Sequence, residues 1–350
     1  MKNWFMPAVL ATATLMLAAC GGSSNNNNND EVGTQPPAQS PWPEGAILLQ
    51  PGEDLTQQAQ EALINAQTGD WIVFPEGTFE ISSTLTFDGD VDGDGNIVED
   101  ITITGYGMDK TILSHENANS GDGIFVQNAK DITITDLSVR EAKNNGIKLK
   151  DTDGIILRDL SAIWEGSLNK DNGAYGVYPV ECSNIRIEGT YVRGSADAGI
   201  YVGQSEYIVV RNNIAEENVA GIEIENSKYA DVYQNTAVGN TGGILVFDLP
   251  INNQRYGTSV RVFNNVVTAN NTPNFANASS NPAGVHIVPQ GTGIIVLSTS
   301  DVEIFDNEIT DNDTMGVAVS SFFIAEQDIP TFLANYGQPG QAIEDGWRAV

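Results

Sequence analysis

A glycine followed by alternating apolar side chains recurs along most of this chain, as in Gly199-Ile-Tyr-Val and Gly221-Ile-Glu-Ile. The glycines that open such runs are Gly123, Gly146, Gly176, Gly199, Gly221, Gly243, Gly293 and Gly316. Their separations are 22 or 23 residues, with one step of 30 and one of 50. A run this short cannot bury its apolar side alone, so each repeat has to stack on its neighbours to make a core. The sequence therefore predicts a solenoid.

Two further signals accompany the repeats. About nine residues after most opening glycines comes a second short alternation, such as Ile208-Val-Val210. Asparagine then recurs at one register, at Asn213, Asn235, Asn265 and Asn307. Asparagines at one corner of successive turns stack their amides and tolerate left-handed backbone. A leucine-rich repeat would add a helix to each unit and a propeller would need blades of about 40 residues, so parallel stacked strands fit best.

The two long steps are interpreted as repeats that carry insertions. The step of 30 holds one insertion around residues 164–172. The step of 50 corresponds to one or two repeats, with inserts at residues 249–257 and 272–290.

The predicted fold class is all-β: a parallel β-helix solenoid over residues 44–325, with coils of about 22 residues. A short N-terminal cap helix is expected near residues 54–67, with Asp54 as its N-cap. Residues 326–350 form either a cap at the other end, with a short helix over residues 328–337, or the start of a continuation.

The repeats, together with the segment "GDWIVFPEGTFEI" and the following "ITITGYGMDKTIL", resemble the parallel β-helix repeat proteins of the pectin-lyase-like superfamily. The resemblance covers roughly residues 45–320 and implies a right-handed winding. Because this fold carries many functions, function has to be argued from the site.

The N-terminus has the features of an export signal over residues 1–19. Lys2 precedes an apolar run, Phe5–Ala19, which is too short to cross a membrane as a helix. Leu17-Ala18-Ala19-Cys20 resembles the lipobox of bacterial lipoproteins, which implies acylation of Cys20 and, with Gly21 after it, retention at the outer membrane, on its periplasmic or surface face. The alternative is a secreted protein with an incidental cysteine. Residues 20–43, rich in Gly, Ser, Asn and Pro, are expected to form a tether.

Charge excludes one class of partner. The chain has 46 acidic and 16 basic side chains, a formal net charge of -30, which repels nucleic acid. We expect a monomer that meets the membrane only through its lipid anchor. No disulfide is expected, because acylation of Cys20 would leave Cys182 without a partner.

Chemistry is expected on the outward residues, because the inward ones are Ile, Val and Leu. Parallel stacking places Lys148, Tyr178, Tyr201 and Glu223 in one row, where aromatic faces suit sugar rings and lysine suits uronate carboxylates. The catalytic candidates are Lys148, Tyr175, Tyr178, Tyr201 and Glu223; the substrate-binding candidates are Phe125, Lys150, Glu225 and Phe247. The alternative is a solvated sheet face without a ligand.

The run Tyr175–Val180 resembles the Tyr-Gly-Phe-Asp-Pro-His stretch of mannuronan epimerases, which use its Tyr, Asp and His and an Asp on the next turn. The Tyr, Gly and Pro match. The acid is replaced by Tyr178, the imidazole by Val180, and the next-turn acid falls on Gly203. These departures argue against epimerase chemistry.

A lyase would need a base and an acid near a uronate ring. Lys148 and Lys150, about 7 Å apart along a strand, are expected to lower one another's pKa, and Tyr178 or Tyr201 would be the acid. Glu223 and Glu225 lie near the separation that a retaining glycosidase uses.

An acidic loop is the metal candidate. Its oxygen donors are Asp88, Asp90, Asp92, Asp94 and Glu99. Alternating carboxylates with glycine let one loop wrap Ca²⁺, in a structural role.

Overall, the sequence favours a cell-envelope lipoprotein that engages extracellular polysaccharide as a lyase or epimerase relative. The alternative is a non-catalytic β-helix binding or structural protein.

Overall fold

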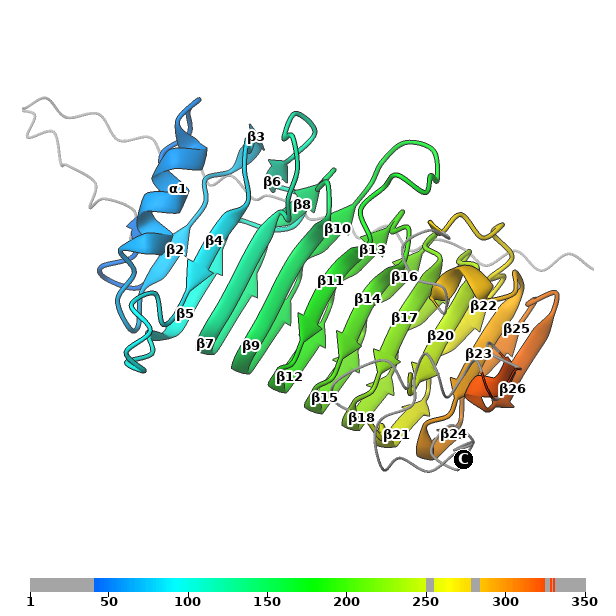
Figure 1. Cartoon of the computed structure of the whole chain (residues 1–350). Helices are drawn as coiled ribbons and strands as arrows, with labels where there is room; N and C mark the ends of the chain where they lie inside the picture. Colours follow the sequence, from blue (N-terminus) through cyan, green and yellow to red (C-terminus); the bar gives the residue numbers. More distant parts are fainter. Residues whose placement is uncertain (1–40, 250–254, 278–283, 325–327, 329, 331–350) are drawn as a thin grey trace, which may run out of the picture. The chain divides into compact units, whose positions relative to one another are not determined.

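The computed structural model describes residues 41–249, 255–277, 284–324, 328 and 330. The predicted signal, Cys20, nearly all of the tether and most of the C-terminal segment lie outside the described residues. The described residues from Trp42 onward form one compact unit. Its strands stack side by side as a parallel solenoid, with helix α1 (Leu55–Ile64) at one end (Figure 1).

Each turn contributes strands to three rows. The first row holds β4 (Leu85–Asp88), the starts of β7 (Ile124–Thr135) and β9 (Asn145–Arg158), β11 (Tyr175–Val180), β14 (Ala198–Gly203), β17 (Ala220–Glu225), β20 (Gly242–Phe247), β23 (Thr292–Leu297) and β26 (Met315–Ser320). The second row holds β1 (Ile47–Leu48), β2 (Trp71–Val73), β5 (Glu99–Thr104), the ends of β7 and β9, β12 (Ser183–Glu188), β15 (Glu206–Arg211), β18 (Lys228–Tyr233), β21 (Thr258–Phe263) and β24 (Ser300–Phe305). We call the outer surfaces of these rows the first face and the second face.

The third row is a separate sheet of nine parallel strands. It holds β3 (Gly77–Glu80), β6 (Thr111–Ser114), β8 (Ser138–Arg140), β10 (Ser161–Ile163), β13 (Tyr191–Arg193), β16 (Ile214–Glu216), β19 (Thr236–Val238), β22 (Val266–Thr268) and β25 (Glu308–Thr310). Two short 3₁₀ segments, Val285–Ile287 and Phe322–Ile324, complete the described structure. The first and second rows form one sheet of 17 strands.

The inward side chains form the core that the repeat predicts. Ile200, Ile222, Ile244 and Ile294 occupy the same position of successive first-row strands, and all four are fully buried. Because Ile244 pairs directly with Ile294, the step of 50 residues is a single turn. The step of 30 is also a single turn, since Ile147 pairs with Val177.

The cap helix is present, and Asp54 is its N-cap residue as expected, but the Asp54 side chain makes no capping hydrogen bond. Instead the Asp54 carboxylate accepts a hydrogen bond from the Gln58 side chain (3.0 Å). The helix covers the end of the core with Leu55, Ala59 and Leu63.

The asparagines stack as predicted. The side-chain oxygen of Asn235 accepts from the backbone N–H (3.0 Å) and the side-chain amide (2.9 Å) of Asn213, and Asn265 and Asn307 repeat the pattern. The left-handed residues, however, are those just before the ladder, such as Asn212 and Asn264.

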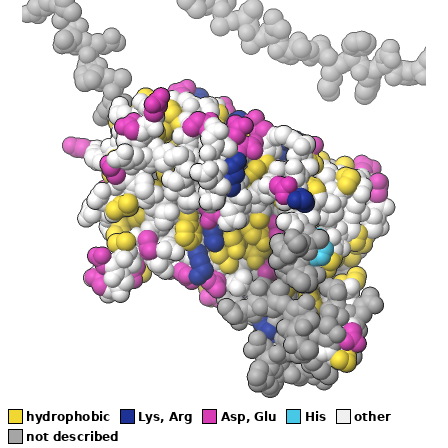
Figure 2. All heavy atoms as spheres, turned by 45° about the horizontal axis from the view of Figure 1, so that its top comes forward, with side chains coloured by type: hydrophobic (Ala, Val, Ile, Leu, Met, Phe, Trp, Pro, Cys, Tyr) yellow, Lys and Arg dark blue, Asp and Glu magenta, His cyan; other side chains and the backbone are white. Residues whose placement is uncertain are grey.

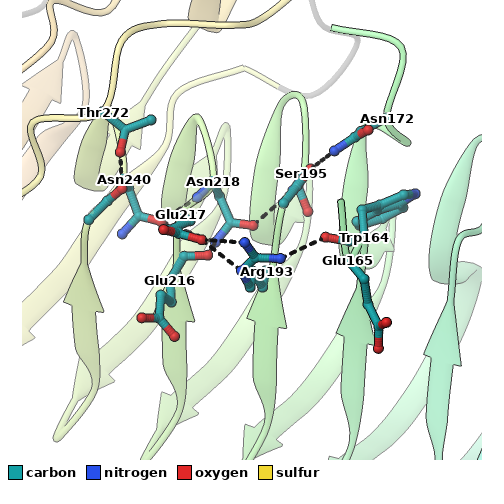
Figure 3. A network of polar contacts seen from close by, with 12 residues as sticks. Trp164, Glu165, Asn172, Arg193, Ser195, Glu216, Glu217, Asn218, Asn240 and Thr272 are labelled. Atoms are coloured by element: carbon teal, nitrogen blue, oxygen red, sulfur yellow. Dashed lines mark hydrogen bonds and ion pairs between the residues drawn. The ribbon is translucent and has the colours of Figure 1, made fainter. Parts of the chain in front are cut away.

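A second ladder of asparagines lies at another corner. It consists of Asn218, Asn240, Asn270 and Asn312. Figure 3 shows its first members beside Arg193, which pairs with Glu217 (2.6 Å) and donates to the carbonyl of Trp164 (3.1 Å). The insertion at residues 164–172 is thereby tied to the solenoid through Trp164.

Candidate functional site

The first face is divided into an open part and a covered part. Over β7, β9 and β11 the outward side chains Phe125, Lys148 and Tyr178 are partly exposed. From β14 to β23 the outward side chains are buried, with Glu223 only 2% exposed. The solvated face considered from the sequence is therefore wrong for the covered part.

An outer apolar cluster makes the cover. The outward side chains Leu245, Phe247, Ile295 and Leu297 pack against Leu249 and against Val285, Val288 and Phe322. Leu249 and Val285 belong to the two inserts of the 50-residue turn. Phe247, a substrate-binding candidate from the sequence, is 4% exposed and lies inside this cluster rather than on an open surface.

The two candidate lysines differ in their surroundings. The Lys148 ammonium lies between two rings, 5.2 Å from the centroid of Phe125 and 5.3 Å from that of Tyr178. Lys150 is paired with Asp151 (2.6 Å) and Glu181 (2.8 Å). These hydrogen bonds raise the pKa of Lys150. The expectation that Lys148 lowers the pKa of Lys150 is therefore wrong, and Lys150 stays a cation.

Three tyrosines gather at the boundary of the cover. The ring centroids of Tyr175 and Tyr178 are 4.4 Å apart, and those of Tyr175 and Tyr201 are 4.6 Å apart. The Tyr201 hydroxyl donates to the carboxylate of Glu225 (2.9 Å). Burial, followed by the charge of nearby carboxylates, raises the pKa of Tyr175 and Tyr201 well above the usual value. These hydroxyls therefore keep their protons at neutral pH.

Gly203 provides the space for Tyr201. A Cβ at this glycine would lie 2.2 Å from the Tyr201 hydroxyl oxygen. The strand register pairs Val180 with Gly203 and Gly203 with Glu225. Gly203 therefore lies on the turn after Val180, and the Tyr201 hydroxyl lies over it.

Three carboxyl groups lie close enough to influence one another: Asp197, Glu223 and Glu225. Burial, followed by the negative charge of Glu225, raises the pKa of Asp197 to about 7. The Tyr175 hydroxyl donates a hydrogen bond to Asp197 and acts in the opposite direction. Burial, then the charges of Glu225 and Asp197, raises the pKa of Glu223 well above its usual value. Glu223 thus holds its proton more tightly than a solvated carboxyl does, and Asp197 titrates near neutral pH.

Sequence reasoning missed Asp197. It stands two residues before the opening glycine of its turn, where neighbouring turns have Ala174, Val219 and Thr241. The sequence signal that could have identified Asp197 is a single acid at a repeat position that is uncharged in the neighbouring turns. Asp197 is partly exposed and lines a hollow of about 160 Å³, together with Lys143, Asn172 and His286. It is therefore the member of the carboxyl cluster that solvent can reach.

The face drawn in Figure 2 shows apolar side chains gathered in a central patch, with basic and acidic side chains beside them. The combination of aromatic rings, a lysine and shifted carboxyl groups supports proton transfer on a ligand that stacks on rings.

Two carboxylates of the acidic loop, those of Asp88 and Glu99, already interact with side chains of this chain. Asp88 accepts hydrogen bonds from Gln127 (2.6 Å) and Asn128 (3.1 Å), and Glu99 pairs with Lys130 (2.8 Å). Within the described residues, no group of three or more His, Cys, Asp or Glu could hold a metal ion. Calcium binding by this loop stays a prediction.

Among the residues that the structure describes, none of the helices has the length and apolar character that a membrane span requires.

Comparison with known families agrees with the geometry. Residues 122–291 match the family model described as right handed beta helix region. The protein is a right-handed parallel β-helix. No curated protein matches the sequence.

Several solved structures resemble this β-helix at low identity. The A-module of mannuronan C-5 epimerase AlgE4 from Azotobacter vinelandii is 15% identical, with 77% of this chain and 78% of that one covered and a TM-score of 0.47. Polygalacturonase from Erwinia carotovora is 14% identical, with 76% and 94% covered and a TM-score of 0.44. An alginate lyase from Paenibacillus is 15% identical, with 78% and 99% covered and a TM-score of 0.34. Likeness at this level carries no argument about function, which has to rest on the site.

Proposed function

We propose that the protein binds a uronate-containing polysaccharide along the first face and carries out acid–base chemistry on it. One observation carries the proposal. A partly exposed strip of Phe125, Lys148 and Tyr178 leads to a solvent-accessible carboxyl, Asp197, whose pKa is raised to about 7.

The strip suits a sugar that bears a carboxylate. Aromatic faces offer flat apolar surface to a sugar ring. Lys148 makes no ion pair within the described residues and lies between the two rings. Its ammonium is available to a ligand carboxylate, whereas Lys150 is already neutralised by two acids.

The carboxyl cluster supplies the proton chemistry. A general base works best when its pKa lies near the working pH, which Asp197 satisfies. Tyr175 keeps its proton and contacts Asp197, so an acid and a base lie side by side. Asp197 would take the C5 proton next to the uronate carboxylate, the C4–O bond would break as the C4–C5 double bond forms, and Tyr175 would protonate the leaving oxygen. The reaction class is elimination at a uronate, as in polysaccharide lyases.

A non-catalytic binding protein is the second candidate. It is favoured by the burial of Glu223 (2% exposed) and Tyr201 (4% exposed), which keeps these two side chains from touching a ligand as they stand. Replacement of the epimerase acid and imidazole by Tyr178 and Val180 points the same way.

The test is an incubation of the purified protein with mannuronate-rich alginate, polygalacturonate and a glucuronate-containing glycan. New double bonds are followed by ultraviolet absorbance and epimerisation by NMR. We expect Asp197→Asn to lower the rate by about 10²–10⁴-fold while glycan retention persists, and Lys148→Met to weaken retention. Glu308→Gln, an exposed acid on the third row, is the control. Retention without any product would support the binding protein and overturn the catalytic proposal.

We also propose that the chain is exported and anchored to the outer membrane through acylated Cys20. The support is the sequence of residues 1–21 alone. Cys20→Ser should abolish incorporation of labelled fatty acid and release the protein from the membrane fraction. Labelling that persists in the variant would refute the anchor.

A further inference from the structure

The second face carries a groove that follows the solenoid axis. One hollow, of about 800 Å³, is lined by Tyr207, Tyr229 and Arg261 among others. A second, of about 570 Å³, is lined by Ile156, Arg186 and again Tyr207. Val209 also lines both hollows, so they adjoin at this point. The groove crosses several turns and lies on a different row of strands from the carboxyl cluster.

Two tyrosines in this groove occupy an unfavourable backbone position. Tyr207 and Tyr229 have φ values of 60° and 57°. The corresponding residues of other turns are Asp100, Asp131, Gly154, Asn184, Ser259 and Asp301. Asp, Asn and Gly adopt left-handed backbone readily, whereas a bulky aromatic residue there is strained.

Burial does not compensate for this strain. Tyr207 is 54% exposed and Tyr229 is 50% exposed. The two rings stack on each other, with centroids 5.2 Å apart and planes 13° apart, and leave an aromatic surface toward the groove. Bulky residues that are half exposed and yet held in a strained backbone conformation are expected at functional sites.

The charges in the groove select the class of ligand. Its lining contains five carboxylates and two guanidinium groups: Asp100, Asp131, Asp231, Asp301, Glu303, Arg186 and Arg261. Arg261 is held by Asp231 through two hydrogen bonds of 2.7 and 2.6 Å. The net negative charge disfavours polyuronates and nucleic acid. Planar carboxylate and guanidinium groups instead offer paired hydrogen-bond partners to the hydroxyl groups of an uncharged sugar.

A protein ligand fits less well. The strands under the groove are hydrogen-bonded to neighbours on both sides, so they offer no edge to an added strand. The apolar surface is interrupted by the charged residues above, unlike the apolar core of a protein interface.

We propose that this groove is a second, non-catalytic site that binds an uncharged polysaccharide chain along the solenoid axis, with Tyr207 and Tyr229 stacked against its sugar rings. The site goes beyond the proposed function of the first face and does not depend on it.

The test is affinity electrophoresis of the full chain in gels containing β-1,3-glucan, β-1,4-mannan or α-glucan. The variant is the double substitution Tyr207→Asn and Tyr229→Asn, because asparagine suits left-handed backbone. We expect retention by at least one of these glycans to weaken about tenfold or more in the variant, while its melting temperature stays equal or rises. Tyr233→Asn, on the same strand as Tyr229 but outside the groove lining, should retain the glycan.

Three results would overturn the proposal. The first is no retention of the unmodified chain by any of the uncharged glycans. The second is an equal loss in Tyr233→Asn. The third is a dimer in sedimentation that the double variant dissolves, which would make the groove an interface between copies of this chain. Because Asp197→Asn should leave this retention unchanged, failure here is distinguishable from failure of the first-face proposal.

Discussion

Replacing Asn235 by alanine should remove a central member of the first asparagine ladder. Its side-chain amide donates to the carbonyl of Val210 (2.9 Å) and to Asn265 (3.0 Å). Its side-chain oxygen accepts from the backbone N–H (3.0 Å) and the side-chain amide (2.9 Å) of Asn213. Asn235 is 1% exposed, so water cannot replace these contacts.

The magnitude follows from the groups that alanine leaves unpaired. The backbone N–H of Asn213 and the carbonyl of Val210 lose the Asn235 side chain as a partner in the interior. A buried polar group left without a partner costs about 1–3 kcal/mol. We therefore expect Asn235→Ala to lower the free energy of unfolding by about 2–6 kcal/mol.

Two further variants sharpen the test. Asn307→Ala removes the last member of the ladder, which is partly exposed, so water should reduce the loss to about half. Asn235→Asp places an anionic oxygen opposite the carbonyl of Val210. Burial should raise the pKa of this new carboxyl, so its cost should be largest at neutral pH and diminish as the pH falls and the carboxyl takes up a proton.

Urea unfolding followed by far-ultraviolet circular dichroism measures the losses. Hydrogen exchange then shows whether the loss is local to these turns, because solenoid turns contact only their neighbours. A loss below about 1 kcal/mol for Asn235→Ala, or an equal loss for Asn307→Ala, would refute the reasoning.

Three further predictions concern stability and metal binding. Ile222→Ala, at a fully buried position between Ile200 and Ile244, should lower the free energy of unfolding by about 2–5 kcal/mol in urea. Burial lowers the pKa of His115 to about 4 from 6.5, so the unfolded chain alone takes up this proton as the pH falls from 6.5 towards 4, and stability should fall in that window. His115→Leu should remove up to about 3 kcal/mol of this loss of stability, and an unchanged pH dependence would contradict the assignment. Ca²⁺ should raise the melting temperature and Asp92→Ala should abolish the rise, whereas calorimetry without heat at millimolar Ca²⁺ would end the proposal.

The core could be predicted from the sequence because its period is regular. Once the opening glycines are aligned, the residue after each is inward, and Ile200, Ile222 and Ile244 follow directly. The first asparagine ladder could be predicted for the same reason. The second ladder was missed, although Asn218, Asn240, Asn270 and Asn312 have the same spacings as the first.

The candidate site could be predicted only in part, because the period says which way a side chain points but not what covers it. Lys148, Tyr178 and Glu223 are all outward residues of the first row, as expected. The first two are partly exposed and the third is buried. The outer apolar cluster, to which Leu249 and Val285 of the two inserts contribute, begins beyond Tyr178, and the repeat does not show where such inserts pack. Burial is the first cause of the pKa shifts of Asp197 and Glu223, so these shifts could not be predicted either.

The position of Asp197 at the margin of the cover explains why its pKa lies near neutrality. Glu223, 2% exposed between the cluster members Tyr201 and Leu245, has its pKa raised well above the usual range, and burial is the first cause for both groups. Asp197 differs because it also lines a hollow and accepts a hydrogen bond from Tyr175, which favours the ionised form. Water in the hollow beside Asp197 would lower the pKa of this carboxyl and make it a weaker base. A sugar ring that fills the hollow would exclude this water and raise the pKa of Asp197. Ligand binding and proton affinity at Asp197 are therefore coupled, so a glycan that occupies the hollow should take up protons on binding near pH 7.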